Sequence, residues 1–203
     1  MFGFRGDRGA AAELHDRLEE LERLAYGSNE MHGDGVYFNQ AGDLCLAAQQ
    51  PVSALEYYGQ SIDAYVKADR FDAATGVCKK VIRLSPSVVR ARCTLAWLAL
   101  GKGFVPEAQE FIEHYLMAAM RAGRDVLARH QMKRMSVIAE EEPLRMYLAE
   151  CLLNMGEERT ADHLFGAVYR ERNHGRTRRH VDTSRRWFEA RRCALMSPSE
   201  IMR

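Results

Sequence analysis

An alanine near the start of a helical segment recurs along this chain, at Ala54, Ala74, Ala108, Ala128 and Ala161, with intervals of 20, 34, 20 and 33 residues. Alternate members of the first four are 54 residues apart. A small side chain lets two helices approach closely, so its recurrence predicts helical hairpins that stack on one another. Two interpretations remain open: three-helix repeats of about 54 residues, or two-helix repeats in which some helices carry both patterns.

The segments between these alanines have the spacing of helices. Apolar residues recur every three or four positions, as in Leu55–Val66, which is typical of a helix buried along one side. No segment shows convincing strand alternation, so the chain is expected to be all-α. The prolines mark the helix ends. Three of them precede an apolar stretch and two follow one: Pro51, Pro106 and Pro143, then Pro86 and Pro198.

Four segments carry several motif positions together. Phe38–Ile62 has Gly42, Ala54 and Tyr58, and it resembles a tetratricopeptide repeat. Three further segments are similar to the same motif: Tyr65–Pro86 through Tyr65, Phe71, Ala74, Val81 and Pro86; Tyr147–Tyr169 through Ala149, Leu152, Gly156, Ala161, Phe165 and Val168; and Ala91–Tyr115 through Trp97, Gly101 and Ala108 with a two-residue insertion around Gly103.

This resemblance implies a right-handed superhelical solenoid of antiparallel helix pairs with flanking capping helices. The predicted division is an acidic amphipathic helix and linker at 1–34, the repeats at 35–172, and a basic capping helix or tail at 173–203. The first region places Leu14, Leu18, Leu21 and Ala25 on one face. Two interpretations of that face stay open, a cap on the solenoid and a surface for self-association.

In this family the first helix of each pair lines a concave groove that binds a peptide or a partner helix. Carried over by motif, the predicted lining is Asn39, Asp43, Leu46, Ala91, Leu95, Leu98, Met146, Glu150 and Leu153. The family's best-known groove clamps a terminal carboxylate with lysine and asparagine. This lining holds no lysine, so such a clamp is not expected. An apolar, mildly acidic groove suits an amphipathic or extended partner with basic residues.

The two ends of the chain carry opposite charge. Residues 13–34 hold seven acids and two arginines, whereas residues 170–192 hold nine arginines and three acids. The predicted basic patch is Arg176, Arg178, Arg179, Arg185, Arg186, Arg191 and Arg192. Three interpretations are open: the solvated face of a capping helix, a site for phosphate or nucleic acid, and a docking segment for an acidic partner.

The composition excludes several classes of function. The net charge is +1, which gives no global attraction to nucleic acid or membrane. No run of residues suits a signal peptide or a membrane span, and the five cysteines lack metal-site spacing. No catalytic motif stands out. We therefore expect a cytoplasmic protein that is not an enzyme and has no cofactor and no metal.

The expected function is that of a protein–protein interaction scaffold or adaptor within a larger assembly, such as a bacterial signalling or secretion complex. Its partner would be a peptide or helix of another protein. Two alternatives are kept. One is an adaptor that binds nucleic acid or another anion through the arginine-rich end. The other is a structural subunit that assembles head to tail, with the acidic end of one copy on the basic end of the next.

Overall fold

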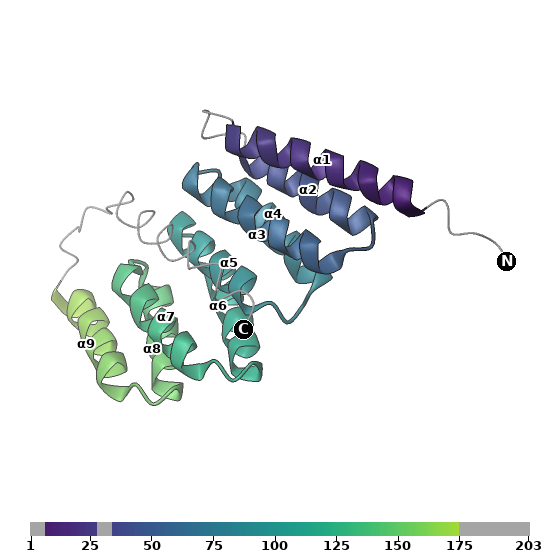
Figure 1. The fold of residues 1–203 in the computed structure, drawn as a ribbon. Coiled ribbons are helices and arrows are strands. Elements are labelled where there is room, and N and C mark those ends of the chain that lie inside the picture. The colour runs from purple at the N-terminus through teal and green to yellow at the C-terminus, as the bar shows by residue number, and fades with distance from the viewer. Residues whose placement is uncertain (1–6, 28–33, 175–203) are drawn as a thin grey trace. The chain divides into compact units, whose positions relative to one another are not determined.

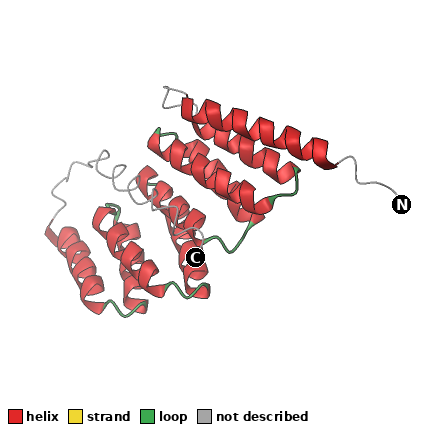
Figure 2. Ribbon diagram, in the orientation of Figure 1, coloured by secondary structure: helices red, strands yellow, loops and turns green. Residues whose placement is uncertain are grey.

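The structure of the chain is a computed structural model that describes residues 7–27 and 34–174. All regular secondary structure in these two ranges is helical, which confirms the all-α prediction (Figure 2). The helices are α1 (Asp7–Gly27), α2 (Asp34–Ala47), α3 (Pro51–Lys67), α4 (Phe71–Leu84), α5 (Val89–Lys102), α6 (Val105–Arg121), α7 (Asp125–Ile138), α8 (Glu142–Asn154) and α9 (Glu158–His174).

The chain divides into two compact units, with the boundary between Pro86 and Ser87. In the N-terminal unit α1 packs on α2, α2 on α3, and α3 on α4 (Figure 1). In the C-terminal unit α5 packs on α6, α6 and α7 pack on α8, and α8 packs on α9. Neighbours in sequence are therefore neighbours in space within each unit, as short connections between helices require.

The helix bounds reveal the repeat. Helices of 17 residues begin at residues 51, 105 and 158, and helices of 14 residues that follow them begin at 71 and 125. The spacings are 54 and 53 for the first set and 54 for the second. Of the two interpretations of the alanine pattern, the helix bounds match three-helix repeats: α2–α4, α5–α7, and a third that begins with α8 and α9.

Small residues occupy equivalent buried positions in these repeats. The recurring alanines are each the fourth residue of their helix, and all five are fully buried. Twelve residues before Ala54, Ala108 and Ala161 stand Gly42, Ala96 and Ala149, which are also buried. In the segment Ala91–Tyr115, the small residue that corresponds to Gly42 is therefore Ala96. The match through Trp97 and Gly101, with an insertion around Gly103, is not needed. Both helices of each pair have a small residue that permits close approach.

Four of the connections between helices share the same length and backbone conformation. Three residues link α2 to α3, α3 to α4, α6 to α7 and α8 to α9, and the middle residue of each has positive φ. Those residues are Gln49, Asp69, Gly123 and Gly156. In each connection the N–H of the third residue donates to the carbonyl five residues earlier, as Arg70 does to Tyr65. This left-handed closure satisfies carbonyls at the helix end and turns the chain back on itself.

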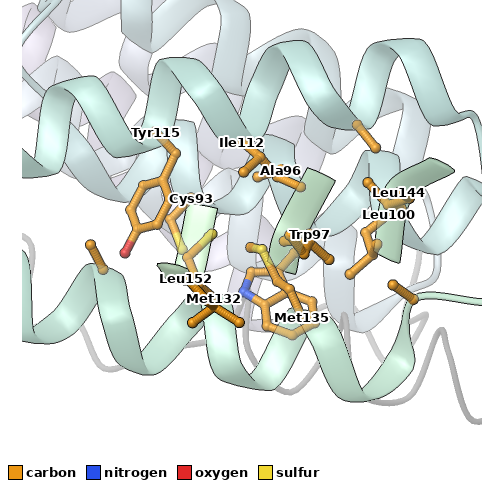
Figure 3. Close-up of a cluster of buried hydrophobic side chains, with 14 of the residues drawn as sticks. Cys93, Ala96, Trp97, Leu100, Ile112, Tyr115, Met132, Met135, Leu144 and Leu152 are labelled. Carbon is orange, nitrogen blue, oxygen red and sulfur yellow. The ribbon is translucent and has the colours of Figure 1, made fainter. Parts of the chain in front are cut away.

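The core of the C-terminal unit gathers around Trp97. It is formed by fully buried side chains of α5, α6, α7 and α8, among them Ile112, Met132, Met135 and Leu152 (Figure 3). Two methionines from α7 lie against the aromatic and aliphatic side chains of the neighbouring helices. Their flexible thioether chains fill the irregular space between helices.

At the other end of the described chain, α1 lies on α2. Leu21 and Ala25 are buried, whereas Leu14 and Leu18 are half-buried. The Tyr57 hydroxyl of α3 donates a 2.6 Å hydrogen bond to the Glu22 carboxylate of α1. The helix thus covers the first repeat, in the place that the capping interpretation gives it. In the part of the chain that the structure describes, no helix combines the length and apolarity needed to cross a membrane.

The close approach at Gly42 can be tested by one methyl group. A Cβ at this position would lie 2.6 Å from Cε1 of Tyr58, whose ring is fully buried. We expect Gly42→Ala to lower the free energy of unfolding by about 1–3 kcal/mol, since overpacking must displace the ring. In the matched control, Gly76→Ala, the added Cβ meets nothing within 4 Å. That variant should gain up to about 1 kcal/mol from helix propensity, and chemical denaturation measures both.

Candidate partner-binding site

A polar network on the N-terminal unit links a lysine of α4 to two residues of α2. The Lys80 ammonium donates hydrogen bonds to the Asp43 carboxylate at 2.6 Å and to Oδ1 of Asn39 at 2.9 Å. It also lies 4.7 Å from the centre of the Tyr58 ring. The Tyr58 hydroxyl donates to the same oxygen of Asp43. The network joins α2, α3 and α4, and it brings two of the predicted lining residues together.

The network is preorganised and partly open to solvent. The side chain of Lys80 is 28% exposed and that of Asp43 is 51% exposed, whereas Tyr58 is fully buried. Burial, together with the hydrogen bond to Asp43, raises the pKa of the Tyr58 hydroxyl, which therefore stays a donor. Leu46, the third predicted residue of α2, is half-buried one turn from Asp43.

Sequence reasoning missed Lys80, because the motif assigns the lining to first helices and Lys80 lies on a third helix. The nine predicted lining residues hold no lysine, but the structure brings Lys80 into contact with two of them, Asn39 and Asp43. The Asp43 carboxylate, however, pairs with this lysine and neutralises it. A clamp for a free carboxylate stays unfavourable, now because the paired lysine has no uncompensated positive charge to attract the ligand. One signal was present in the sequence: Lys80 lies six residues after Ala74, as Arg134 does after Ala128.

The second repeat carries a counterpart of this network, closed off from solvent. Trp97 takes the place of Asp43, and its indole N–H donates a 2.9 Å hydrogen bond to Oε1 of Gln131 on α7. Both side chains are fully buried. The Arg134 guanidinium lies 5.9 Å from the centre of the Trp97 ring. A first helix and a third helix are thus joined by a polar contact in both repeats.

The remaining predicted lining residues divide by exposure. On α5, Ala91, Leu95 and Leu98 are 4%, 4% and 1% exposed. On α8, Met146 is half-buried, and Glu150 and Leu153 are exposed. The Arg145 guanidinium of α8 holds the Glu171 carboxylate of α9 at 2.7 Å, and Arg172 pairs with Glu142. These ion pairs fix α9 against α8 beside the exposed residues.

The seven arginines of the predicted basic patch lie outside the described residues. Within the described ranges, no group of three or more histidine, cysteine, aspartate or glutamate side chains is arranged to hold a metal ion. Burial is the main cause of a raised pKa for the thiols of Cys45 and Cys151, which disfavours the reactive thiolate.

A scan against protein-family models matched no family, and searches of curated proteins and of solved structures found no match.

The buried indole contact makes a prediction for stability. Gln131→Leu keeps the volume of the side chain but leaves the Trp97 N–H without its acceptor. We expect a loss of about 1–3 kcal/mol in the free energy of unfolding, the cost of an unsatisfied buried donor. In a Trp97→Phe background the same substitution should cost much less, because no donor is left. A double-mutant cycle from denaturant unfolding measures the difference, and equal losses in both backgrounds would contradict the assignment.

The buried tyrosine of α6 predicts how stability responds to alkali. Burial, and then the neighbouring Cys93 thiol, raises the pKa of the Tyr115 hydroxyl (Figure 3). Above about pH 10 the unfolded chain loses this proton while the folded chain keeps it, so stability falls as the pH rises. We expect Tyr115 to remove about 1.4 kcal/mol per pH unit in that window. Urea unfolding of wild type and Tyr115→Phe from pH 9 to 11 tests this, and parallel curves would refute it.

Proposed function

We propose that this chain is a scaffold without catalytic activity that binds a segment of another protein through its stacked helical repeats. The proposal includes the superhelical, tetratricopeptide-like arrangement and the cytoplasmic location expected from the sequence. Its support is the repetition of helix bounds with small residues at both close contacts of each pair. A repeat of this kind presents similar surface positions again and again, which suits recognition of an extended or helical partner.

The observation that carries the proposal is the Lys80 network. An ammonium group has three donors, and hydrogen bonds to Asn39 and Asp43 occupy two of them. The side chain is already held in place by these contacts and by the Tyr58 ring. Little side-chain entropy is therefore lost when a partner supplies one more acceptor. Because Asp43 neutralises the lysine, a neutral acceptor such as a backbone carbonyl suits the site better than a carboxylate.

This pairing also changes the expected chemistry of the partner. The sequence suggested a basic partner because the lining contains Asp43 and Glu150. With Asp43 neutralised, the N-terminal unit offers an uncharged polar contact beside the half-buried Leu46. The partner segment that we propose for this site presents a backbone carbonyl next to an apolar side chain.

The test uses the intact chain as bait in an affinity capture from cell extract, with two matched variants. Lys80→Met removes the network ammonium, and Lys79→Met removes the same charge from the adjacent, exposed position on α4. We expect a discrete protein to bind wild type and Lys79→Met and to bind Lys80→Met at least about tenfold more weakly, a loss of about 1.4 kcal/mol.

Two outcomes would contradict the proposal. Equal capture by Lys80→Met would exclude the network as the binding site. Recovery of nucleic acid that is released by salt and needs the arginine-rich end would transfer the function to that end. A chain that stops at His174 distinguishes the second outcome, since it keeps Lys80 and the ion pairs of α9 and lacks all seven arginines of the patch.

A further inference from the structure

The third repeat exposes an apolar position that the first two repeats cover. The twelfth residue of each 17-residue helix is Ile62 in α3, Leu116 in α6 and Tyr169 in α9. Ile62 is 6% exposed and Leu116 is half-buried, whereas Tyr169 is 69% exposed. The eighth residue follows the same trend: Tyr58 and Ile112 are fully buried and Phe165 is only half-buried. Leaving a large aromatic side chain in water is unfavourable, which indicates that this position lacks the neighbour that covers it in the first two repeats.

The first helix of the third repeat shows the same difference. Four residues after the small position stand Leu100 in α5 and Leu153 in α8. Leu100 is fully buried, and Leu153 is 45% exposed. The open face of the third repeat is therefore defined by Met146, Glu150 and Leu153 of α8 and by Phe165 and Tyr169 of α9.

In the two complete repeats side chains of the third helix contact the first helix, at Asp43 in α2 and at Trp97 in α5. The tenth residue of that helix is a cation in both cases, Lys80 in α4 and Arg134 in α7. Lys80 pairs with Asp43, and Arg134 lies over the Trp97 ring. In α8 the position equivalent to Asp43 and Trp97 is held by Glu150. Its carboxylate is exposed and makes no ion pair with a described residue. The occupant of this face should combine an apolar side with a positive charge.

The chain itself contains such a segment. Residues 182–195, DTSRRWFEARRCAL, lie outside the described residues, and their sequence places Trp187, Phe188, Ala194 and Leu195 near one side of a helix. The segment has four arginines against two acids. We propose that residues 182–195 dock on the open face of α8 and α9 of the same molecule and complete the third repeat, with an arginine toward Glu150.

The connection allows this placement. Seven residues, 175–181, separate α9 from the segment, whereas three residues suffice to link α3 to α4 and α6 to α7. Docking within one molecule also carries a high effective concentration, because the connection is short. An occupant on the same chain is therefore favoured over the equivalent segment of a second copy.

The chain has two tryptophans, Trp97 and Trp187, so fluorescence can report the docking in the intact protein. The spectrum of wild type minus that of Trp187→Phe isolates the emission of Trp187. We expect an emission maximum at shorter wavelength than in the unfolded chain, with protection from acrylamide. The double variant Leu153→Ser and Tyr169→Ser should shift this emission to longer wavelength and remove the protection. Far-UV circular dichroism verifies that the variant stays helical.

The matched control is Met120→Ser, which removes a 59% exposed apolar side chain from α6 rather than from the α8–α9 pair. It should leave the Trp187 emission unchanged. The proposal is overturned if folded and unfolded chains give the same Trp187 emission, or if the face variant and the control behave alike. Protection that disappears on dilution would also overturn it, because the segment would then dock on a second copy.

Discussion

The close approach of paired helices at small side chains is the constraint on which the rest of this structure depends. Gly42 accepts the Tyr58 ring at a distance that no Cβ would permit, and buried alanines, the smallest side chains, occupy the equivalent position in the other pairs. With the backbones this close, a three-residue connection is long enough to link one helix to the next. The period of 53 to 54 residues follows from the 17-residue helices α3, α6 and α9, since small differences in the length of the other connections nearly cancel between repeats.

The fold was largely predictable from the sequence because its signals are local. Alanine spacing, apolar periodicity and the prolines near the starts of α3, α6 and α8 are features of single helices or single pairs. The choice between two-helix and three-helix repeats was not predictable, because α3 matches the motif in two ways. It fits as the second helix of one pair and, through Tyr65, as the first helix of the next pair. Only the bounds of successive helices decide it.

The candidate site was predicted in part. Asp43 is exposed and Asn39 is half-buried on α2, but their chemistry depends on Lys80, which is 41 residues from Asn39 in sequence. A motif that assigns one helix to the binding surface cannot show which cation will reach it from another helix. The same limit applies to Trp97 and Gln131, since neither residue type alone indicates a buried polar contact. The equivalence of the repeats does show which cation reaches the first helix, because Lys80 and Arg134 are the tenth residues of α4 and α7.

The order of helices in space, which is their order in sequence within each unit, has a consequence for how the chain folds. A helix needs only the helix just made to begin burying its apolar side, so long loops need not close before contacts form. Chains dominated by such local contacts fold quickly for their size. On a ribosome the first repeat can pack while the later ones are still being synthesised. A duplication of about 54 residues would then lengthen the protein without asking the earlier helices to find new partners.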